Sequence, residues 1–276
     1  MKLKYRFAFR EEDNIAVVEY LKGIKKKYDN STVINVVEVF ENTEEFEFIE
    51  KNVVRPGIII TPVYSKEEME DADWYEVRST WRWEYPKPNN DKADFIDITF
   101  NRPEVCPGEY CGIRQVDLFK INKEPDWKNR HFVMLNWVHG ELFVKTETAR
   151  FLLNSGLKGF EIKDVMLYKK NVLAENIKQI YVNSSLKPGL IVDEGIKQIN
   201  TCEVCGSKRY ITSGRPVHFK KEIFEGLDLD IIKTDEVFGI WSLNDRIIYI
   251  SKRLYSILVD NKLDKNLEFL PLLFDN

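Results

Sequence analysis

The sequence predicts an α+β fold, in which a mixed α/β body containing an internal duplication follows an N-terminal α/β lobe. Three observations lead to this fold class. Short apolar alternations, typical of half-buried strands, are interspersed with segments of helical periodicity. One strand–helix–strand pattern occurs twice, and each copy lies downstream of a cysteine pair that ends in Cys-Gly. We expect the lobe over residues 1–64 and the body over residues 65–276, with pseudo-repeats at about 95–170 and 195–276.

The N-terminal lobe alternates between strand and helix signals. Residues 3–9 alternate as a half-buried strand does, and residues 11–25 have helical spacing. The apolar side of that helix is expected to carry Ile15, Val18, Leu21 and Ile24. Residues 33–40 and 57–61 are rich in β-branched side chains, and Thr43 can cap a short acidic helix between them.

The first part of the body is expected to be rich in strands. A capping pattern over residues 65–68 predicts a helix start, and residues 74–85 form an aromatic-rich β segment. Residues 95–100 alternate apolar and polar side chains, which predicts a strand directly before the first cysteine pair. Residues 115–121 and 132–137 are strand-like as well.

The repeated strand–helix–strand pattern lies at residues 142–162 and again at residues 246–270. In the first copy, Gly156 follows the helix where a left-handed cap residue is favoured. In the second copy, Ser251 is placed to cap the helix. The alignment pairs Val144 with Ile250, Leu152 with Leu258, Leu157 with Leu263 and, after one extra residue, Glu161 with Glu268. The alternative is chance recurrence, because this pattern is common in α/β proteins.

Composition and charge exclude several classes of protein. Hydrophobic residues at 43% and charged residues at 31% are ordinary globular values for a chain of 276 residues. The net charge of -4 lacks the basic excess of a dedicated nucleic-acid binder, so we do not expect nucleic acid as the partner. No apolar run reaches the roughly 18–20 residues that span a bilayer, and the first residues do not resemble a signal peptide. We therefore expect a cytoplasmic protein with no membrane partner.

All four cysteines fall in two short pairs. Cys202 and Cys205 form Cys-x2-Cys-Gly, and Cys106 and Cys111 form the looser Cys-x4-Cys-Gly. Zinc prefers a tetrahedron of thiolate or imidazole ligands, and spacers of two to four residues let both sulfurs of a pair reach one ion. We predict one structural Zn²⁺ held by all four cysteines, because four thiolates leave no open position for catalysis. The alternatives are four buried thiols, a disulfide within one pair, or a site that has lost its metal.

The segments around the second pair resemble a known family. Residues 202–206 are followed by residues 224–230, 248–254 and 267–272 in an order similar to that of the double-CXXCG motif proteins, which are bacterial immunity proteins against contact-dependent or polymorphic toxins. The first spacer is two residues longer than in the family pattern. The resemblance covers roughly residues 70–276. It implies a protein that binds and neutralises a cognate toxin protein and is not an enzyme.

A zinc-ribbon-like nucleic-acid-binding module is the alternative function. The aromatic side chains of residues 74–85 lie beside Arg78 and Arg82 and can stack on bases. We expect most of them to pack in the core, and exposed ones to serve as anchors for a protein partner. Enzyme motifs are missing from the sequence, which has no phosphate-binding loop and no nucleophile motif. The histidines, which form no metal-binding motif, are His131, His139 and His218.

Overall fold

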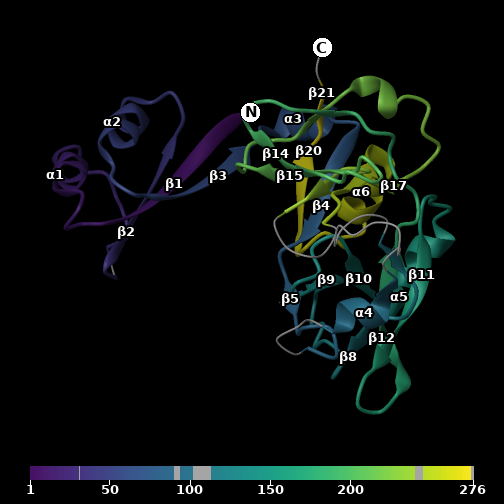
Figure 1. Ribbon diagram of the computed structural model, residues 1–276. Coiled ribbons are helices and arrows are strands. Elements are labelled where there is room, and N and C mark those ends of the chain that lie inside the picture. The colour runs from purple at the N-terminus through teal and green to yellow at the C-terminus, as the bar shows by residue number, and fades with distance from the viewer. Residues whose placement is uncertain (31, 90–93, 102–112, 240–244, 275–276) are drawn as a thin grey trace. The chain divides into compact units, whose positions relative to one another are not determined.

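The computed structural model describes the chain except residues 31, 90–93, 102–112, 240–244 and 275–276. It has a mixed α+β fold that is rich in strands, as the sequence predicts (Figure 1). The chain divides into a first unit, Met1–Asp71 with Thr212–Pro216, and a second unit, Ala72–Ile211 with Val217–Asn276. The domain boundary predicted after residue 64 falls inside the first unit. Among the described residues, no helix has the length and apolarity needed to cross a membrane.

The first unit is a three-stranded antiparallel sheet with two helices on one face. Strand β1 (Lys2–Arg10) lies between β2 (Ile34–Phe40) and β3 (Gly57–Val63). Helices α1 (Ile15–Gly23) and α2 (Glu44–Asn52) pack on alternate side chains of β1, because these are large and apolar whereas those between them are mostly charged. The resulting core contains Leu3, Tyr5, Phe7, Phe9, Val17, Val18, Leu21, Val37, Val39, Phe46 and Ile49.

The predicted apolar side of the first helix is wrong in part. Val18 and Leu21 are buried together with Val17, whereas Ile15 and Ile24 are 61% and 42% exposed. The helix begins only at Ile15, and it contacts the sheet through positions i, i+1 and i+4. The two isoleucines at its ends therefore lie outside the contact area.

Two of the helices in the first unit, α2 and α3 (Lys66–Asp71), begin at the predicted capping residues. The Phe46 backbone N–H donates to Thr43 Oγ1 at 3.2 Å, which caps α2. Helix α3 begins with a reciprocal pair of bonds: the Glu68 N–H donates to Ser65 Oγ at 3.2 Å, and the Ser65 N–H donates to Glu68 Oε2 at 2.8 Å.

A segment distant in sequence completes the first unit. Residues 212–216 lie along β3, where a Cβ at Gly214 would be 2.6 Å from the Ile60 carbonyl oxygen. Arg215 Nη2 donates to Tyr5 Oη at 2.8 Å and to Glu41 Oε1 at 2.5 Å. Only glycine fits the close backbone approach and the φ of +94° at position 214. In sequence, this segment lies between β15 (Lys208–Thr212) and β16 (His218–Phe219).

The second unit contains two larger sheets. The six-stranded sheet has the order β5 (Arg82–Trp83), β9 (Phe132–Leu135), β10 (Leu142–Lys145), β12 (Val172–Tyr181), β11 (Glu161–Leu167) and β8 (Lys120–Ile121). The four-stranded sheet has the order β17 (Ile231–Lys233), β19 (Ile248–Ser251), β4 (Trp74–Ser79) and β20 (Leu267–Pro271). Helix α5 (Thr146–Asn154) joins β10 to β11, and helix α6 (Lys252–Asp260) joins β19 to β20.

The two sheets share one topology and one register. The order β9-β10-β12-β11 in the first corresponds to β17-β19-β4-β20 in the second. Val144 lies opposite Phe132 and Lys178, and its predicted counterpart Ile250 lies opposite Ile231 and Tyr75. The aligned pair Glu161 and Glu268 agrees as well. Glu161 is opposite Tyr181 and Glu268 is opposite Arg78, and these two partners lie three residues after Lys178 and Tyr75, respectively. The predicted duplication would produce this correspondence, although the duplication itself stays a prediction.

Each of the two sheets takes one central strand from the other half of the second unit, where the first half runs from β4 to β11 and the second half from β12 to β21 (Leu273–Phe274). β4 precedes the first copy in sequence and yet pairs with β19 and β20 of the second. β12 opens the second half and pairs with β10 and β11 of the first. After each of these strands the chain crosses to the opposite sheet, where Arg82 pairs in parallel with Met134 and Ser185 bridges in parallel to Lys233. Leu152 and Leu258, aligned in the prediction, both line a cavity of about 20 Å³ between the sheets.

The segment at residues 95–100 is the clearest incorrect element prediction. It forms helix α4 (Phe95–Thr99), and only its last residue belongs to a strand, β6 (Phe100–Asn101). Phe95, Ile96 and Thr99 are buried together because they lie on one side of a helical turn. Residues 115–121 form two short strands at their ends, β7 (Arg114–Gln115) and β8.

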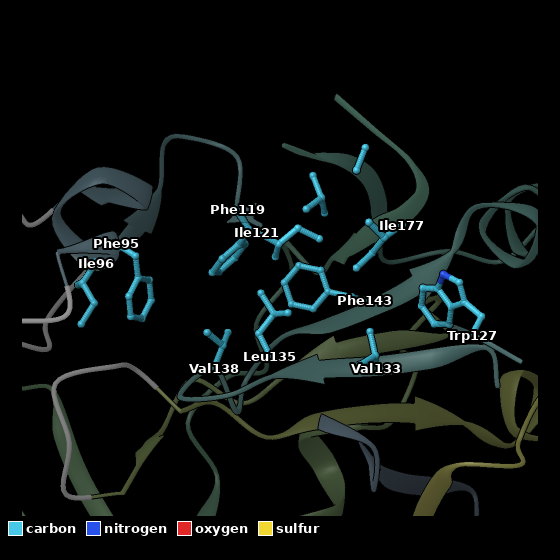
Figure 2. Packing of buried hydrophobic residues seen from close by; sticks show 12 residues of the cluster. Phe95, Ile96, Phe119, Ile121, Trp127, Val133, Leu135, Val138, Phe143 and Ile177 are labelled. Carbon is cyan, nitrogen blue, oxygen red and sulfur yellow. The ribbon is translucent and has the colours of Figure 1, made fainter. Parts of the chain in front are cut away.

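Buried aromatic and aliphatic side chains fill the six-stranded sheet's core (Figure 2). Figure 2 shows Phe119, Leu135 and Phe143 close together at the centre of this cluster, and the rings of Phe119 and Phe143 pack edge to face with centroids 5.2 Å apart. Trp81 and Trp83 pack against the same cluster. The remaining strands form two small sheets, β13 (Leu190–Ile191) with β16 (His218–Phe219) and β21 (Leu273–Phe274), and β14 (Ile196–Thr201) with β15 (Lys208–Thr212) and β18 (Val237–Phe238).

Candidate functional site

Cys202 and Cys205 lie in the turn of the hairpin formed by β14 and β15. The Cys202 N–H donates to the Ser207 carbonyl at 2.8 Å, and the Gly206 N–H donates to the Cys202 carbonyl at 2.9 Å. Gly206 has a φ of +72°, in the left-handed region that glycine adopts without strain. The turn is therefore closed by backbone bonds, with Cys205 exposed and Cys202 half-buried. This geometry suits a two-thiolate arm of a zinc site.

The first cysteine pair lies outside the described residues, so the structure does not place Cys106 or Cys111. The strands that flank this segment are described: Phe100 is opposite Gln115, and Asn101 is opposite Arg114, in an antiparallel pair. Both cysteine pairs thus lie between two antiparallel strands. In the described part of the chain, no group of three or more His, Cys, Asp or Glu side chains could hold a metal. The convergence of four sulfurs stays a prediction.

None of the three histidines forms a metal-binding group with the described cysteines Cys202 and Cys205. His131 Nδ1 lies 2.9 Å from Thr148 Oγ1, and burial lowers the pKa of His131. His218 lies on β16, with Nδ1 3.5 Å from Asp193. His139 is found elsewhere, in the wall of a cleft of about 490 Å³. Burial, reinforced by Arg82, lowers the pKa of His139.

The cleft lies between the two halves of the second unit. Its walls come from residues 138–141, from the crossover at residues 181–185, and from Lys233, Asp245 and Arg246. Phe100 and Arg114, on the paired strands β6 and β7 that flank the first cysteine pair in sequence, also line it. Its volume lies in the range that holds small ligands or an inserted side chain of a partner.

A buried ion pair crosses the cleft. Lys233 Nζ lies 2.6 Å from Glu141 Oε1, and the two side chains are only 9% and 13% exposed. Gln179 Nε2 donates to Glu141 Oε2 at 3.0 Å, and the Gln179 and Gln115 amides exchange hydrogen bonds of 2.8 and 2.9 Å. Both oxygens of Glu141 are thus satisfied, as a buried carboxylate requires.

The other half of the unit has apolar side chains at the positions that correspond to this ion pair. The shared register puts Met134 where Lys233 lies and Ile247 where Glu141 lies. Met134 is 2% exposed, so an apolar side chain fills the corresponding buried position. A buried ion pair adds little stability compared with an apolar pair of similar volume. The charges therefore mark the cleft as a candidate functional site.

Asp245 is the most perturbed acid of the cleft. Burial raises its pKa to about 7, against the opposing effects of Arg209, Arg82 and the His139 backbone N–H. At neutral pH this carboxyl group is therefore divided between its charged and neutral forms. Groups with such pKa values in clefts are common at functional sites.

Replacing Asp245 with asparagine is expected to stabilise the protein above neutral pH. The folded-state pKa is higher than the unfolded value near 3.8, so the folded protein binds more protons and loses stability as pH rises between about 4 and 7. The asparagine amide imitates the neutral form and removes this loss. Urea titrations of both proteins should show a stability difference that grows by roughly 2–4 kcal/mol from about pH 4 to pH 8. A pH-independent difference would contradict the assignment.

Sequence reasoning missed this cleft because its groups are distant in the chain. Glu141, Lys233 and Asp245 come from three loops or strands, and no motif joins them. One signal was available: Lys233 ends the apolar strand Ile231–Lys233, where a charged residue requires a partner.

Comparisons of this chain with protein-family models, with curated protein sequences and with solved structures find no match. The likeness to the double-CXXCG proteins therefore depends on the cysteine motifs and on the segments that follow the second pair.

Proposed function

We propose that this protein is an immunity protein that binds a cognate bacterial toxin and neutralises it by covering its active surface. A structural Zn²⁺ bound by Cys106, Cys111, Cys202 and Cys205 would join the two halves of the second unit. The closed turn at Cys202–Cys205 carries this proposal, because backbone hydrogen bonds hold the two cysteines in one tight turn, as the family motif requires.

The described strands beside the two cysteine pairs support a shared metal. Phe100 and Arg114, on the paired strands β6 and β7 that flank the first cysteine pair in sequence, line the cleft. In the second hairpin, β15 pairs with β18, and Phe238 of β18 bridges to Asp245 in the wall of the same cleft. The described strands next to each cysteine pair therefore line one cleft or lie within one strand pairing of its wall. Bound metal would supply rigidity and no chemistry.

The surface offers features suited to a protein partner. Of the aromatic stretch, Trp74 and Tyr75 are buried, as expected for core residues, while Tyr85 is 37% exposed. Tyr85 packs on Trp137, which is 45% exposed, with ring centroids 4.5 Å apart. Exposed Trp and Tyr side chains are frequent anchors at protein interfaces. Acidic side chains in the first turn of α2 can speed encounter with a basic partner, and these are Glu44, Glu45 and Glu47.

Metal analysis tests the cysteine site. The purified protein is expected to contain one Zn²⁺ per chain, and Cys106→Ser and Cys202→Ser should each lose it because both pairs bind the same ion. A chelator should lower the melting temperature by roughly 5–10 °C, as removal of a structural zinc costs several kcal/mol. Glu203→Gln, in the same turn, is the matched control and should retain the metal. Retention of zinc by Cys106→Ser would contradict the shared site.

Toxin neutralisation tests the immunity function. The toxin domain encoded beside this protein's gene should bind the purified chain, and co-expression should restore growth of cells that produce the toxin. Tyr85→Ala and Trp137→Ala are expected to weaken toxin binding by at least tenfold if the aromatic pair is an anchor. If the wild-type chain neither binds the toxin domain nor protects the cells, the proposal is rejected. Binding of single-stranded DNA that weakens steeply with salt would favour the zinc-ribbon alternative instead.

A further inference from the structure

The sheet of the first unit has a second face that neither α1 nor α2 covers. These two helices pack on the side chains of Leu3, Tyr5, Phe7 and Phe9. Side chains alternate along a strand, so the remaining residues of β1 point to the opposite face. These residues are Lys2, Lys4, Arg6, Ala8 and Arg10. The middle strand of this open face is therefore strongly basic.

Apolar side chains flank the basic strand on both sides. Residues directly opposite in a sheet share a face, and the register pairs Lys4 with Phe40 and Arg10 with Ile34 on β2. On β3 it pairs Arg6 with Ile59 and Lys2 with Val63. All four apolar residues are well exposed, at 39% for Phe40, 47% for Ile34, 54% for Ile59 and 38% for Val63. Exposed apolar groups of this density mark interaction surfaces.

The positive charge on this face is not balanced within it. Two described residues of the open face are carboxylates, against four cations: Glu38, which accepts from Lys4 Nζ at 3.1 Å, and Asp29, which bridges to Val36 beside the edge of β2. Arg10 lies 3.5 Å from Glu12, just beyond the strand. In the described part of the chain, Lys2 and Arg6 have no ion-pair partner. Acidic residues outnumber basic ones in the unit as a whole, so the positive charge is a local property of this face.

The chemistry of the face selects a protein partner over a nucleic acid. Single-stranded nucleic acids bind to cations combined with aromatic rings on which bases stack. Here the apolar residues around the cations are aliphatic except Phe40. Exposed isoleucine and valine are stabilised by burial against other aliphatic side chains, and the unpaired cations are stabilised by carboxylates.

We propose that the open face of the β2-β1-β3 sheet is a docking surface for an acidic, partly apolar segment of a partner protein. The carboxylates of this segment pair with Lys2 and Arg6, and its apolar side chains cover Ile34, Phe40, Ile59 and Val63. This surface lies on the first unit, outside the region that resembles the immunity family. The proposal goes beyond the neutralising function and does not depend on it.

A peptide titration on the full chain tests this surface. The probe is a labelled amphipathic peptide of about 18 residues, or five helical turns, made of leucine on one side and glutamate on the other. Fluorescence anisotropy should show binding that weakens as salt rises. Lys2→Glu/Arg6→Glu should weaken it by at least tenfold. The matched control Lys22→Glu/Lys26→Glu, which changes charge equally on the helix side, should change it less than twofold.

Further titrations distinguish the acidic peptide from other ligands of this face. Ile59→Ser is expected to weaken peptide binding about tenfold, because it removes an exposed apolar contact without changing charge. If the two double variants weaken peptide binding equally, the proposal is overturned, because the peptide is then attracted by the net charge of the protein and not by this face. Tighter, face-dependent binding of an oligothymidine or of vesicles rich in phosphatidylglycerol would also overturn it. Circular dichroism of each variant confirms that the fold is retained.

Discussion

Glu141→Ile is expected to destabilise the second unit by roughly 3–5 kcal/mol. The substitution leaves the Lys233 ammonium group buried without its carboxylate partner, and an unpaired buried charge is costly. Gln179 also loses one acceptor, although it keeps its bonds to Gln115. Urea unfolding at neutral pH, followed by tryptophan fluorescence, measures the change.

The double variant Glu141→Ile/Lys233→Met should recover most of that loss. It installs the apolar residues found at the corresponding positions of the other half, Ile247 and Met134. A coupling energy of about 2–4 kcal/mol is expected from the double-mutant cycle. If the double variant is as unstable as Glu141→Ile alone, the ion pair is required by the architecture. If it is stable but loses toxin binding, the charges serve function.

Gly159→Ala is expected to cost about 3 kcal/mol or more. A Cβ at this position would lie 2.2 Å from the carbonyl oxygen of Ile231, far inside van der Waals contact. The φ of +103° is also a conformation that residues other than glycine rarely adopt. The first half approaches β17 here, so the backbone of one half must move away from the other. Thermal unfolding should show a lower melting temperature.

Gly23→Ala is the matched control for this prediction. Gly23 ends α1, and nothing lies within 4 Å of the Cβ that the substitution would add. Alanine favours the helical conformation, so a change of less than about 1 kcal/mol is expected, towards greater stability. If Gly159→Ala is tolerated as well as Gly23→Ala, the close approach of the two halves at Ile231 is wrong.

Elements with strong local signals are predicted correctly from the sequence. Ser251 caps α6 by accepting from the Leu254 N–H at 3.2 Å, as the sequence indicates. Gly156, with a φ of +65°, follows the end of α5 where a left-handed residue is expected. Capping depends on a few neighbouring residues, so the sequence contains all of the information needed.

The pairing of strands could not be predicted because it depends on contacts between distant residues. The aromatic segment at residues 74–79 signals a strand, but nothing local shows that its partners are β19 and β20. Residues 95–100 have an apolar pattern that fits both a strand and one turn of helix, and burial of Phe95, Ile96 and Thr99 decides for the helix. The cleft could not be predicted for the same reason, because its charged residues come together only when the two halves of the second unit pack.

The turn at the second cysteine pair is local, and it could be predicted from the sequence. The Cys-x2-Cys-Gly spacing indicates a tight turn, and the structure has that turn, with Gly206 in the left-handed conformation. The partner pair at Cys106 and Cys111 lies outside the described residues, so its contribution to a common site stays a prediction.

The exchange of β4 and β12 has a consequence for synthesis of the chain. Ser79 at the end of β4 accepts a hydrogen bond from Asn266, a residue 187 positions later. While the ribosome still holds the last part of the chain, β4 has neither β19 nor β20 beside it, and its apolar side chains lack their final cover. Sheets whose strands are distant in sequence fold slowly. Until the last strand pairs, they expose unpaired strand edges and apolar surface to chaperones and proteases. A nascent chain that stops before residue 267 is therefore expected to be degraded.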